Sequence, residues 1–202
     1  MADAYIFQAD IYCADCAESI MAQIAAAGGK PADTSDESTF DSDVWPKGPY
    51  TDGGGESDTP QHCAGCGTFL ENPLTSDGYE YVRESIAEYV SGEGPGGDYT
   101  VLNQWIEFYE IPLWVAMAYL PGCLPDSGPY VYFDAESARE ALAADARERA
   151  DSFEDESEAH SSGWEAFAQR LESADDIDSD YIKETAPDGY VWSVERETRL
   201  HG

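Results

Sequence analysis

Residues 5–16 have the sequence YIFQADIYCADC, and residues 62–67 have the sequence HCAGCG. Each stretch contains one Cys-x-x-Cys pair: Cys13 and Cys16, then Cys63 and Cys66. Zinc takes four soft ligands in a tetrahedron, and a Cys-x-x-Cys pair supplies two of them from one tight turn. The two pairs therefore predict one closed structural Zn²⁺ site that has these four cysteines as its ligands.

The two halves of this site are not equivalent. Gly67 follows the second pair and suits a knuckle whose backbone amides turn toward the sulfur atoms, whereas Ala17 follows the first pair and leads into a helical pattern. The spacer, residues 17–62, is longer than the roughly 15–20 residues of a standard ribbon pattern, which an insertion between the knuckles explains. A thioredoxin-like redox pair is the alternative, although two pairs fit a metal better. Disulfides are disfavoured because the chain shows no secretion signal.

Two further residues bear on this chemistry, His62 and Cys123. His62 can replace a cysteine, hydrogen-bond a thiolate, or simply adjoin the knuckle, and the last interpretation is favoured. Cys123 has no paired cysteine beside it and is expected to be a small buried or turn residue.

Motifs of catalysis are missing from the sequence. A closed site of four thiolates leaves the metal no open position, so catalysis at the ion is not expected. The chain has no H-E-x-x-H, G-x-S-x-G, Walker A or zinc-deaminase motif. Residues 92–97 match G-x-G-x-x-G, but they follow a helical pattern and contain Pro95 and Glu93, so a plain turn is predicted. No catalytic residue is assigned, and the protein is predicted not to be an enzyme.

The charge of the chain excludes several classes of partner. Its 202 residues include 42 acidic and 10 basic side chains, a formal net charge of -32. Affinity for nucleic acid comes from cations that displace counterions from phosphate, so direct binding to DNA or RNA over a broad surface is excluded. Anionic membrane surfaces are disfavoured for the same reason. Since 42% of the residues are hydrophobic and 12% aromatic, the chain can bury a core instead of remaining disordered.

No long apolar segment is found. The longest apolar stretch, residues 111–120, has ten residues, against roughly 20 needed to span a bilayer. The first ten residues have neither a basic segment nor a sustained apolar run, so no signal peptide is recognised. A cytoplasmic location is therefore expected.

The pattern of apolar residues, glycines and prolines predicts an α+β fold, in which an N-terminal zinc-knuckle module packs on a small sheet with several helices. Residues 1–76 are predicted to form the zinc-binding module, with a long acidic Gly/Ser/Asp loop, and residues 77–202 an α+β body with a hairpin and a C-terminal strand. The expected strands and strand fragments cover residues 5–12, 68–70, 113–120, 130–133 and 189–195. The expected helices cover residues 17–27, 79–90, 99–110, 135–150 and 164–171, and the expected loop residues 30–61.

Acidic residues concentrate in three places: the loop carboxylates Asp33, Asp36, Glu37, Asp41 and Asp43, and the runs 154–158 and 172–180. The loop lacks the residue order of an EF-hand, so a dedicated calcium site is not expected. Carboxylates one helical turn apart stand about 5–6 Å from each other, a spacing not far from that of phosphates along a strand. Rows of them can therefore compete for a basic DNA-binding groove. The alternatives are a solvated surface of no special purpose and adaptation to a saline host.

Two stretches, HCAGCGTFLENPLTSDGYEYV (62–82) and YLPGCLPDSGPYVYFDAESARE (119–140), are similar to uncharacterised small acidic zinc-ribbon-like proteins of bacteriophages and mobile elements. The resemblance covers at most about a third of the chain and brings no catalytic residues. It implies an accessory protein that acts on a host's own machinery, in the host cytoplasm if it is phage-encoded.

Together these features predict a non-enzymatic, zinc-stabilised acidic protein that binds and inhibits a nucleic-acid-binding host protein, as a DNA mimic of the anti-defence type. The expected partner is a basic or nucleic-acid-binding protein, not nucleic acid itself and not a membrane. The alternative is a zinc-ribbon-like interaction or adaptor protein whose acidity reflects a saline host.

Overall fold

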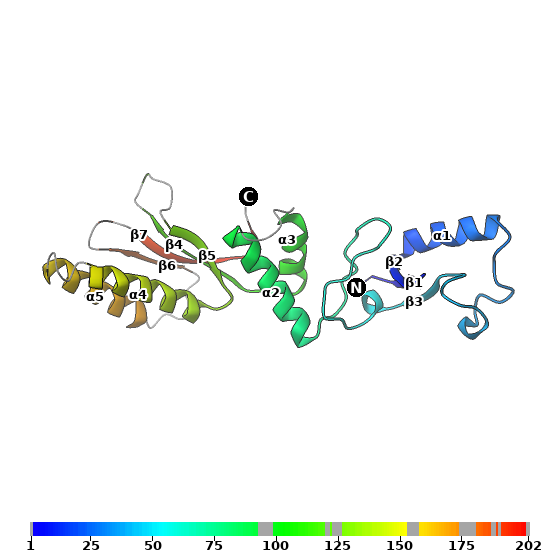
Figure 1. The fold of residues 1–202 in the computed structure, drawn as a ribbon, viewed down its shortest axis with the longest axis horizontal. Coiled ribbons are helices and arrows are strands. Elements are labelled where there is room, and N and C mark those ends of the chain that lie inside the picture. Colours follow the sequence, from blue (N-terminus) through cyan, green and yellow to red (C-terminus); the bar gives the residue numbers. More distant parts are fainter. Residues whose placement is uncertain are drawn as a thin grey trace. The chain divides into compact units, whose positions relative to one another are not determined.

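The computed structural model describes residues 2–92, 99–119, 122, 127–152, 158–173, 181–186, 189 and 191–200. The chain divides into two compact units, Met1–Val82 and Arg83–Gly202. Each unit contains helical residues and one antiparallel sheet, so the fold is of the α+β class, as predicted (Figure 1). The boundary predicted between residues 76 and 77 stays a prediction.

The sheet of the first unit has the strand order β2-β1-β3 and consists of β1 (Ala4–Phe7), β2 (Asp10–Cys13) and β3 (Lys47–Tyr50). The prediction of one strand over residues 5–12 is wrong, because β1 and β2 form a hairpin. Its turn consists of Gln8 and Ala9, whose φ angles are 52° and 65°. Such turns favour Asn-Gly, so Gln-Ala gave no turn signal.

Helix α1 (Ala14–Ala26) follows β2 directly and begins three residues before the predicted start at residue 17. Its end agrees with the prediction, since Gly28 adopts a φ of 82° directly after the last turn. Within this helix Ala17 is buried, while Ile20 and Ile24 are only half-buried.

The loop predicted over residues 30–61 is more structured than expected. It contains β3 and two short 3-10 helices, η1 (Glu37–Thr39) and η2 (Asp52–Gly54). The strand was missed because it contains glycine and proline, Gly48 and Pro49, joined by a cis peptide bond. An edge strand tolerates proline, since one side of it needs no hydrogen-bond donor. Trp45, within this segment, is buried.

Helices α2 (Ser76–Ser91) and α3 (Tyr99–Phe108) confirm the two helices predicted over residues 79–90 and 99–110. The apolar spacing of three and four residues places Val82 and Ile86 of α2 in buried positions.

The sheet of the second unit has the strand order β5-β4-β7-β6, with every neighbouring pair antiparallel. Its strands are β4 (Leu113–Tyr119), β5 (Ser127–Tyr132), β6 (Tyr181–Thr185) and β7 (Val191–Glu197). The hairpin of β4 with β5 and the final strand confirm the predictions. Strand β6 was not predicted, because its sequence YIKET is short, lies beside an acidic run and contains Lys183 and Glu184, two residues that are depleted in strands.

Helices α4 (Ala135–Ser152) and α5 (Glu158–Ser173) pack against each other beside this sheet (Figure 1). They share a core with β4 and β7 in which Trp164, Phe167 and Trp192 are fully buried, with ring centroids 5.4–5.7 Å apart. The guanidinium of Arg149 lies 5.5 Å from the ring centroids of Trp164 and Trp192.

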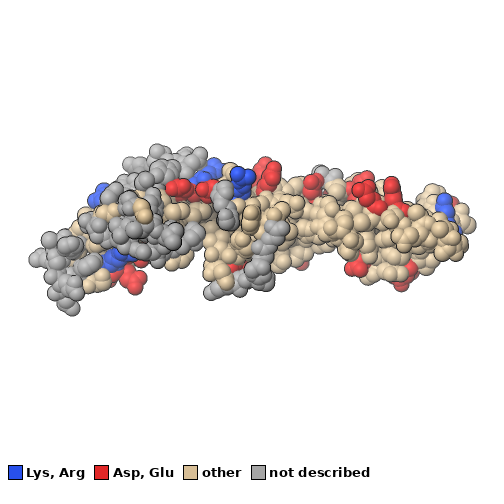
Figure 2. Space-filling model, turned by 90° about the horizontal axis from the view of Figure 1, so that it is seen from above, with Lys and Arg blue, Asp and Glu red and all other residues tan. Residues whose placement is uncertain are grey.

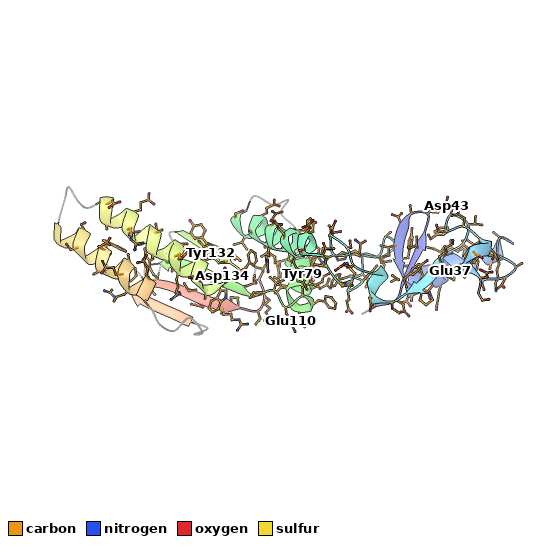
Figure 3. The ribbon with its side chains drawn as sticks, turned by 90° about the horizontal axis from the view of Figure 1, so that it is seen from below. Glu37, Asp43, Tyr79, Glu110, Tyr132 and Asp134 are labelled. Carbon is orange, nitrogen blue, oxygen red and sulfur yellow. The ribbon has the colours of Figure 1, made fainter. Side chains whose placement is uncertain are left out.

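The start of α4 agrees with the predicted start at residue 135, and Asp134 caps the helix. The backbone N–H of Ser137 donates a 2.7 Å hydrogen bond to Asp134 Oδ1, and Figure 3 shows Asp134 just before the helix, near the half-buried Tyr132. The start of α5 differs from the prediction, since it lies at residue 158 instead of 164.

Some predicted features lie outside the described residues: most of the segment 92–97, Cys123, and most of the acidic runs 154–158 and 172–180. Within the described part of the chain, no helix combines the length and the apolar character needed to cross a membrane.

Candidate metal centre

The four paired cysteines come together in the first unit. The sulfur atoms of Cys13, Cys16, Cys63 and Cys66 all lie within 4.8 Å of one another and could hold one metal ion. The sulfur atoms of Cys13 and Cys66 are 3.7 Å apart. A tetrahedral zinc site with Zn–S bonds of about 2.3 Å has sulfur–sulfur edges of about 3.8 Å. A disulfide would require about 2.05 Å, and all four cysteines are free.

The first pair is positioned by the junction of β2 with α1. Cys13 is the last residue of β2 and the N-cap residue of α1, with extended backbone angles, and Cys16 lies in the first helical turn. The N-terminal end of a helix carries partial positive charge and unpaired N–H groups, which favour a thiolate over a thiol. The spacing of three residues therefore places two sulfur atoms beside the positive end of the helix, although burial of Cys13 and hydrogen bonds among the cysteines outweigh its effect on their acidity.

The second pair lies in a tight knuckle. The N–H of Cys63 donates to the carbonyl of Thr68 and the N–H of Gly67 to the carbonyl of Cys63, both over 2.8 Å. Gly67 has a φ of 75°, a conformation that glycine adopts without strain. The N–H of Ala64 donates to the carbonyl of Ile11 in β2 over 2.9 Å. A backbone hydrogen bond thus joins the knuckle to the strand that ends in the first pair.

Gly65 allows the two pairs to approach. A Cβ atom at this position would lie 3.0 Å from the sulfur of Cys16. Since carbon atoms rarely come this close to a neighbouring side chain, a larger residue would force the sulfur of Cys16 to shift by a few tenths of an ångström.

The four sulfur atoms differ in acidity because they share hydrogen bonds. The pKa of Cys66 is lowered to about 6, chiefly by its 3.1 Å contact with the hydroxyl of Thr68. The pKa of Cys16 is raised to about 12, chiefly by hydrogen bonds with Cys63 and Cys13. Burial raises the pKa of Cys13; it also opposes ionisation of Cys63, but nearby backbone N–H groups outweigh it and lower that pKa. Metal binding therefore has to displace protons from this cluster.

The cluster forms one side of a small core. Cys63 is 2% exposed and packs with Ala4 and Leu70, while Cys13 and Cys16 are half-buried against them. Cys66 alone among the four is exposed. The cysteine side chains are therefore also part of the packing of this core.

His62 lies beside the knuckle. Its Nδ1 is 3.0 Å from the carbonyl oxygen of Gly67, and its ring packs on Phe69 with 5.3 Å between centroids. These contacts orient the ring toward backbone and an aromatic side chain, and the group of clustered ligand atoms contains cysteines alone among the described residues.

Asn72 is a structural residue that sequence reasoning missed. Its side chain is 0% exposed and makes three hydrogen bonds to backbone. Its Oδ1 accepts from the N–H of Gln61 over 2.7 Å, and its Nδ2 donates to the carbonyls of Thr59 and Pro73 over 3.3 and 3.0 Å. Asparagine before proline predicts an exposed turn, so the sequence did not indicate burial.

The loop carboxylates are partly used inside the loop. Glu37 accepts hydrogen bonds from the N–H of Gly48 over 2.7 Å and from the hydroxyl of Tyr50 over 3.2 Å, which fastens η1 to β3 (Figure 3). Hydrogen bonds from Ser35 and Ser38 lower the pKa values of Asp33 and Asp36. Asp33 and Asp36 therefore stay ionised at neutral pH.

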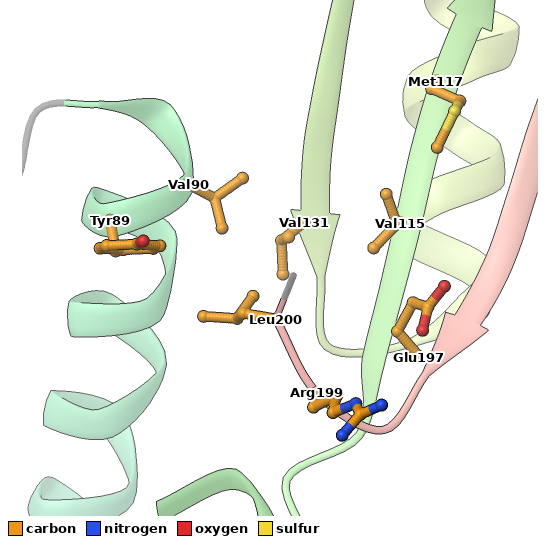
Figure 4. A pocket seen from close by; sticks show the side chains of 8 residues that line it. All are labelled: Tyr89, Val90, Val115, Met117, Val131, Glu197, Arg199 and Leu200. Carbon is orange, nitrogen blue, oxygen red and sulfur yellow. The ribbon is translucent and has the colours of Figure 1, made fainter. Parts of the chain in front are cut away.

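The second unit has a cavity of about 370 Å³ (Figure 4). Most of its lining is apolar, and Glu197 and Arg199 carry opposite charges on its wall: the lining residues are Tyr89, Val90, Val115, Met117, Val131, Glu197, Arg199 and Leu200. Cysteine and histidine are not among these described lining residues, so the cavity resembles an apolar binding surface more than a metal or nucleophile site.

No family model matches the chain, and comparison with curated proteins and with solved structures finds no significant match.

Proposed function

We propose that the protein is a non-enzymatic, zinc-stabilised acidic protein that binds and inhibits a nucleic-acid-binding host protein, as expected for small accessory proteins of mobile elements. The single observation that carries the binding part is a formal charge of -32 on a chain that folds into two compact units. The cysteine cluster supports the zinc part of the proposal.

Zinc is the metal that best suits the cluster. Four thiolates form a soft ligand set, which selects zinc, copper(I) or iron, and a tetrahedral arrangement of single sulfur atoms fits one zinc ion. Four protein ligands leave no position for water or substrate. The ion therefore stabilises the fold and takes no part in a reaction.

Metal analysis tests this part directly. Protein purified without added metal is expected to contain one equivalent of zinc, which Cys63→Ser removes. Cys123→Ser is the matched control, since Cys123 belongs to neither pair and its loss leaves the zinc content unchanged. A disulfide within each pair, or a visible iron–thiolate absorption band in place of zinc, would contradict the assignment.

The surface charge supports a basic partner. Residues 1–82 contain fifteen acidic side chains and two lysines, a formal net charge of -13 for this unit. Figure 2 shows carboxylates at several places on the visible face of each unit, with Lys and Arg side chains beside some of those in the second unit. The negative electrostatic field of this net charge attracts a basic protein surface from a distance and speeds association at low salt. A groove that binds phosphates is the kind of basic face that carboxylates can occupy.

A competition assay tests the partner. The protein is offered to immobilised basic nucleases, polymerases and RNA-guided complexes at low and at high salt, with and without duplex DNA. We expect binding that weakens steeply with salt and that DNA displaces. Failure to bind any of them at low salt would remove the proposal. A partner that binds this protein and DNA at the same time would favour the alternative of an adaptor protein. That alternative attributes the acidity to a saline host, so it also requires that the proteins of the source organism have an acidic median isoelectric point.

A further inference from the structure

The first unit has a concave surface formed by residues that lie between the two cysteine pairs in the sequence. It is a cavity of about 530 Å³ in the segment between α1 and β3. Four apolar side chains and two carboxylates account for most of its lining: Pro31, Ala32, Phe40 and Val44, with Asp33 and Asp41. We call it the Phe40 pocket. Val44 is 54% exposed, a high value for a valine and one that leaves part of the apolar lining open to solvent.

We propose that the Phe40 pocket receives an arginine side chain from the surface of the partner protein. This inference rests on the proposed function, because it names the feature of a basic partner that one particular surface of this chain recognises. It also separates a specific contact from the diffuse attraction that the overall charge produces.

The apolar part of the pocket suits the stem of a long cationic side chain. Arginine buries its methylene groups against apolar surface while its charged end remains near solvent. Val44 and Phe40 offer such a surface. The ring of Phe40 already lies near a cation, since Lys47 Nζ is 5.7 Å from its centroid. An aromatic face attracts positive charge, so an arriving guanidinium would share the ring of Phe40 with Lys47 or displace it.

The two carboxylates suit the charged end. Asp33 Oδ1 accepts hydrogen bonds from the N–H and the hydroxyl of Ser35 over 2.9 and 2.6 Å, and Asp41 Oδ1 accepts one from the N–H of Asp43 over 3.1 Å. These bonds hold both carboxylates in place before a partner arrives, which reduces the entropy lost on binding. The bonds from Ser35 also lower the pKa of Asp33 and keep it ionised.

The charge of the surrounding segment favours a cation over an anion. Residues 29–47 contain five carboxylates and two lysines, a formal net charge of -3 that already includes Lys47. Arginine fits better than lysine, because its planar guanidinium can donate to a carboxylate through two parallel hydrogen bonds and can stack on an aromatic ring.

Titration with two small probes tests the pocket in the full-length, zinc-loaded protein. N-acetylarginine amide is the cationic probe, and N-acetylcitrulline amide is its uncharged near-isostere. We expect the arginine probe to shift the methyl signals of Val44 in a saturable manner, and the citrulline probe to bind about tenfold more weakly. Equal shifts with both probes would overturn the proposal, and so would shifts confined to residues outside the pocket.

Charge-matched variants provide the control. Asp33→Asn with Asp41→Asn removes two charges yet keeps the Oδ1 acceptors of the loop, and it is expected to abolish the difference between the probes. Glu18→Gln with Glu56→Gln removes two exposed charges elsewhere in the unit and is expected to preserve that difference. If both double variants behave alike, a specific pocket is disproved.

The same variants distinguish this inference from the proposed function. With a basic partner protein, the pocket variant is expected to lose about tenfold in affinity and the control variant severalfold less. An equal loss in both would mean that diffuse charge alone binds the partner, which keeps the proposed function and removes the pocket. A response of Val44 to arginine without binding to any basic protein would keep the pocket and remove the proposed function. Self-association through the pocket would appear as a concentration-dependent mass that the arginine probe reverses, and it would overturn the assignment of a foreign partner.

Discussion

Replacing Asn72 by alanine is expected to loosen the segment that carries the second cysteine pair. The amide of Asn72 is fully buried and joins two chain segments, because it accepts from the N–H of Gln61 and donates to the carbonyls of Thr59 and Pro73. Alanine removes all three hydrogen bonds at once. It also takes away the acceptor of the Gln61 N–H, whereas the carbonyls of Pro73 and Thr59 keep hydrogen bonds from the N–H of Ser57 and the side-chain amide of Gln61.

The expected cost is about 3 kcal/mol, since each of the three hydrogen bonds contributes about 1 kcal/mol net of the competing bonds to water. A free-energy difference of this size corresponds to about a hundredfold change in the local opening equilibrium.

Asn72→Asp is a sharper variant. It keeps the acceptor for Gln61 but turns a charged oxygen toward two carbonyls, so its cost is expected to be larger at neutral pH and to fall when acid protonates the new carboxyl group.

Hydrogen exchange in the full-length, zinc-loaded protein measures this effect where it occurs. The amides of Cys63 and Leu70 keep their own acceptors and report the opening of the knuckle segment. Their exchange is expected to accelerate about a hundredfold in Asn72→Ala. Asn103→Ala is the control, because Asn103 makes a comparable pair of hydrogen bonds to Leu200 in the other unit. Acceleration of less than fivefold in the test variant, or the same acceleration in the control, would refute the reasoning.

Three further predictions follow from the same structure. Gly53→Ala is expected to destabilise the first unit by at least about 2 kcal/mol in urea unfolding, because a Cβ at a φ of 63° would overlap the carbonyl oxygen of Leu70. Asp134→Ala is expected to cost about 1 kcal/mol at neutral pH. Hydrogen bonds from Ser137 lower the pKa of Asp134, so this stabilisation is complete above about pH 4 and is lost as the pH falls through the lowered pKa. The free energies of unfolding of the two proteins, measured in urea, should therefore converge as the pH falls through this range. Removal of zinc with a chelator is expected to release the knuckle amides to exchange while the near-ultraviolet circular dichroism of the buried aromatic rings in the second unit persists.

Features that depend on short-range chemistry could be predicted from the sequence. The cysteine spacing fixes two ligands per turn, and the apolar spacing of α2 and α3 follows from 3.6 residues per turn, so neither needs knowledge of distant contacts. Asp134 precedes a helical pattern and has a short side chain that reaches the first N–H groups, so its role as a cap was predictable for the same reason.

Features that depend on distant contacts could not be predicted. β3 contains Gly48 and Pro49 and is a strand only because β1, more than forty residues earlier, supplies its hydrogen-bond partners. The turn at Gln8 has no glycine or asparagine, so the pairing of the flanking strands imposes its conformation. Asn72 belongs to a Pro-containing segment, and its burial is decided by the backbone groups of Gln61 and Thr59 that surround it.

The metal centre and the acidic surface of the first unit depend on each other. The core beside the cysteines is small, and Cys63 is one of its buried members, so the ion and the packing stabilise the same residues. A formal charge of -13 on 82 residues opposes compaction, and structural zinc sites in small domains contribute about 10 kcal/mol to folding, enough to offset such repulsion. The Phe40 pocket lies in the segment between α1, which begins at the first cysteine pair, and β3, which pairs with β1. The proposed zinc site would therefore anchor this segment through α1 and, by way of β2 and β1, through β3, and removal of the metal is expected to weaken arginine binding although every carboxylate is kept.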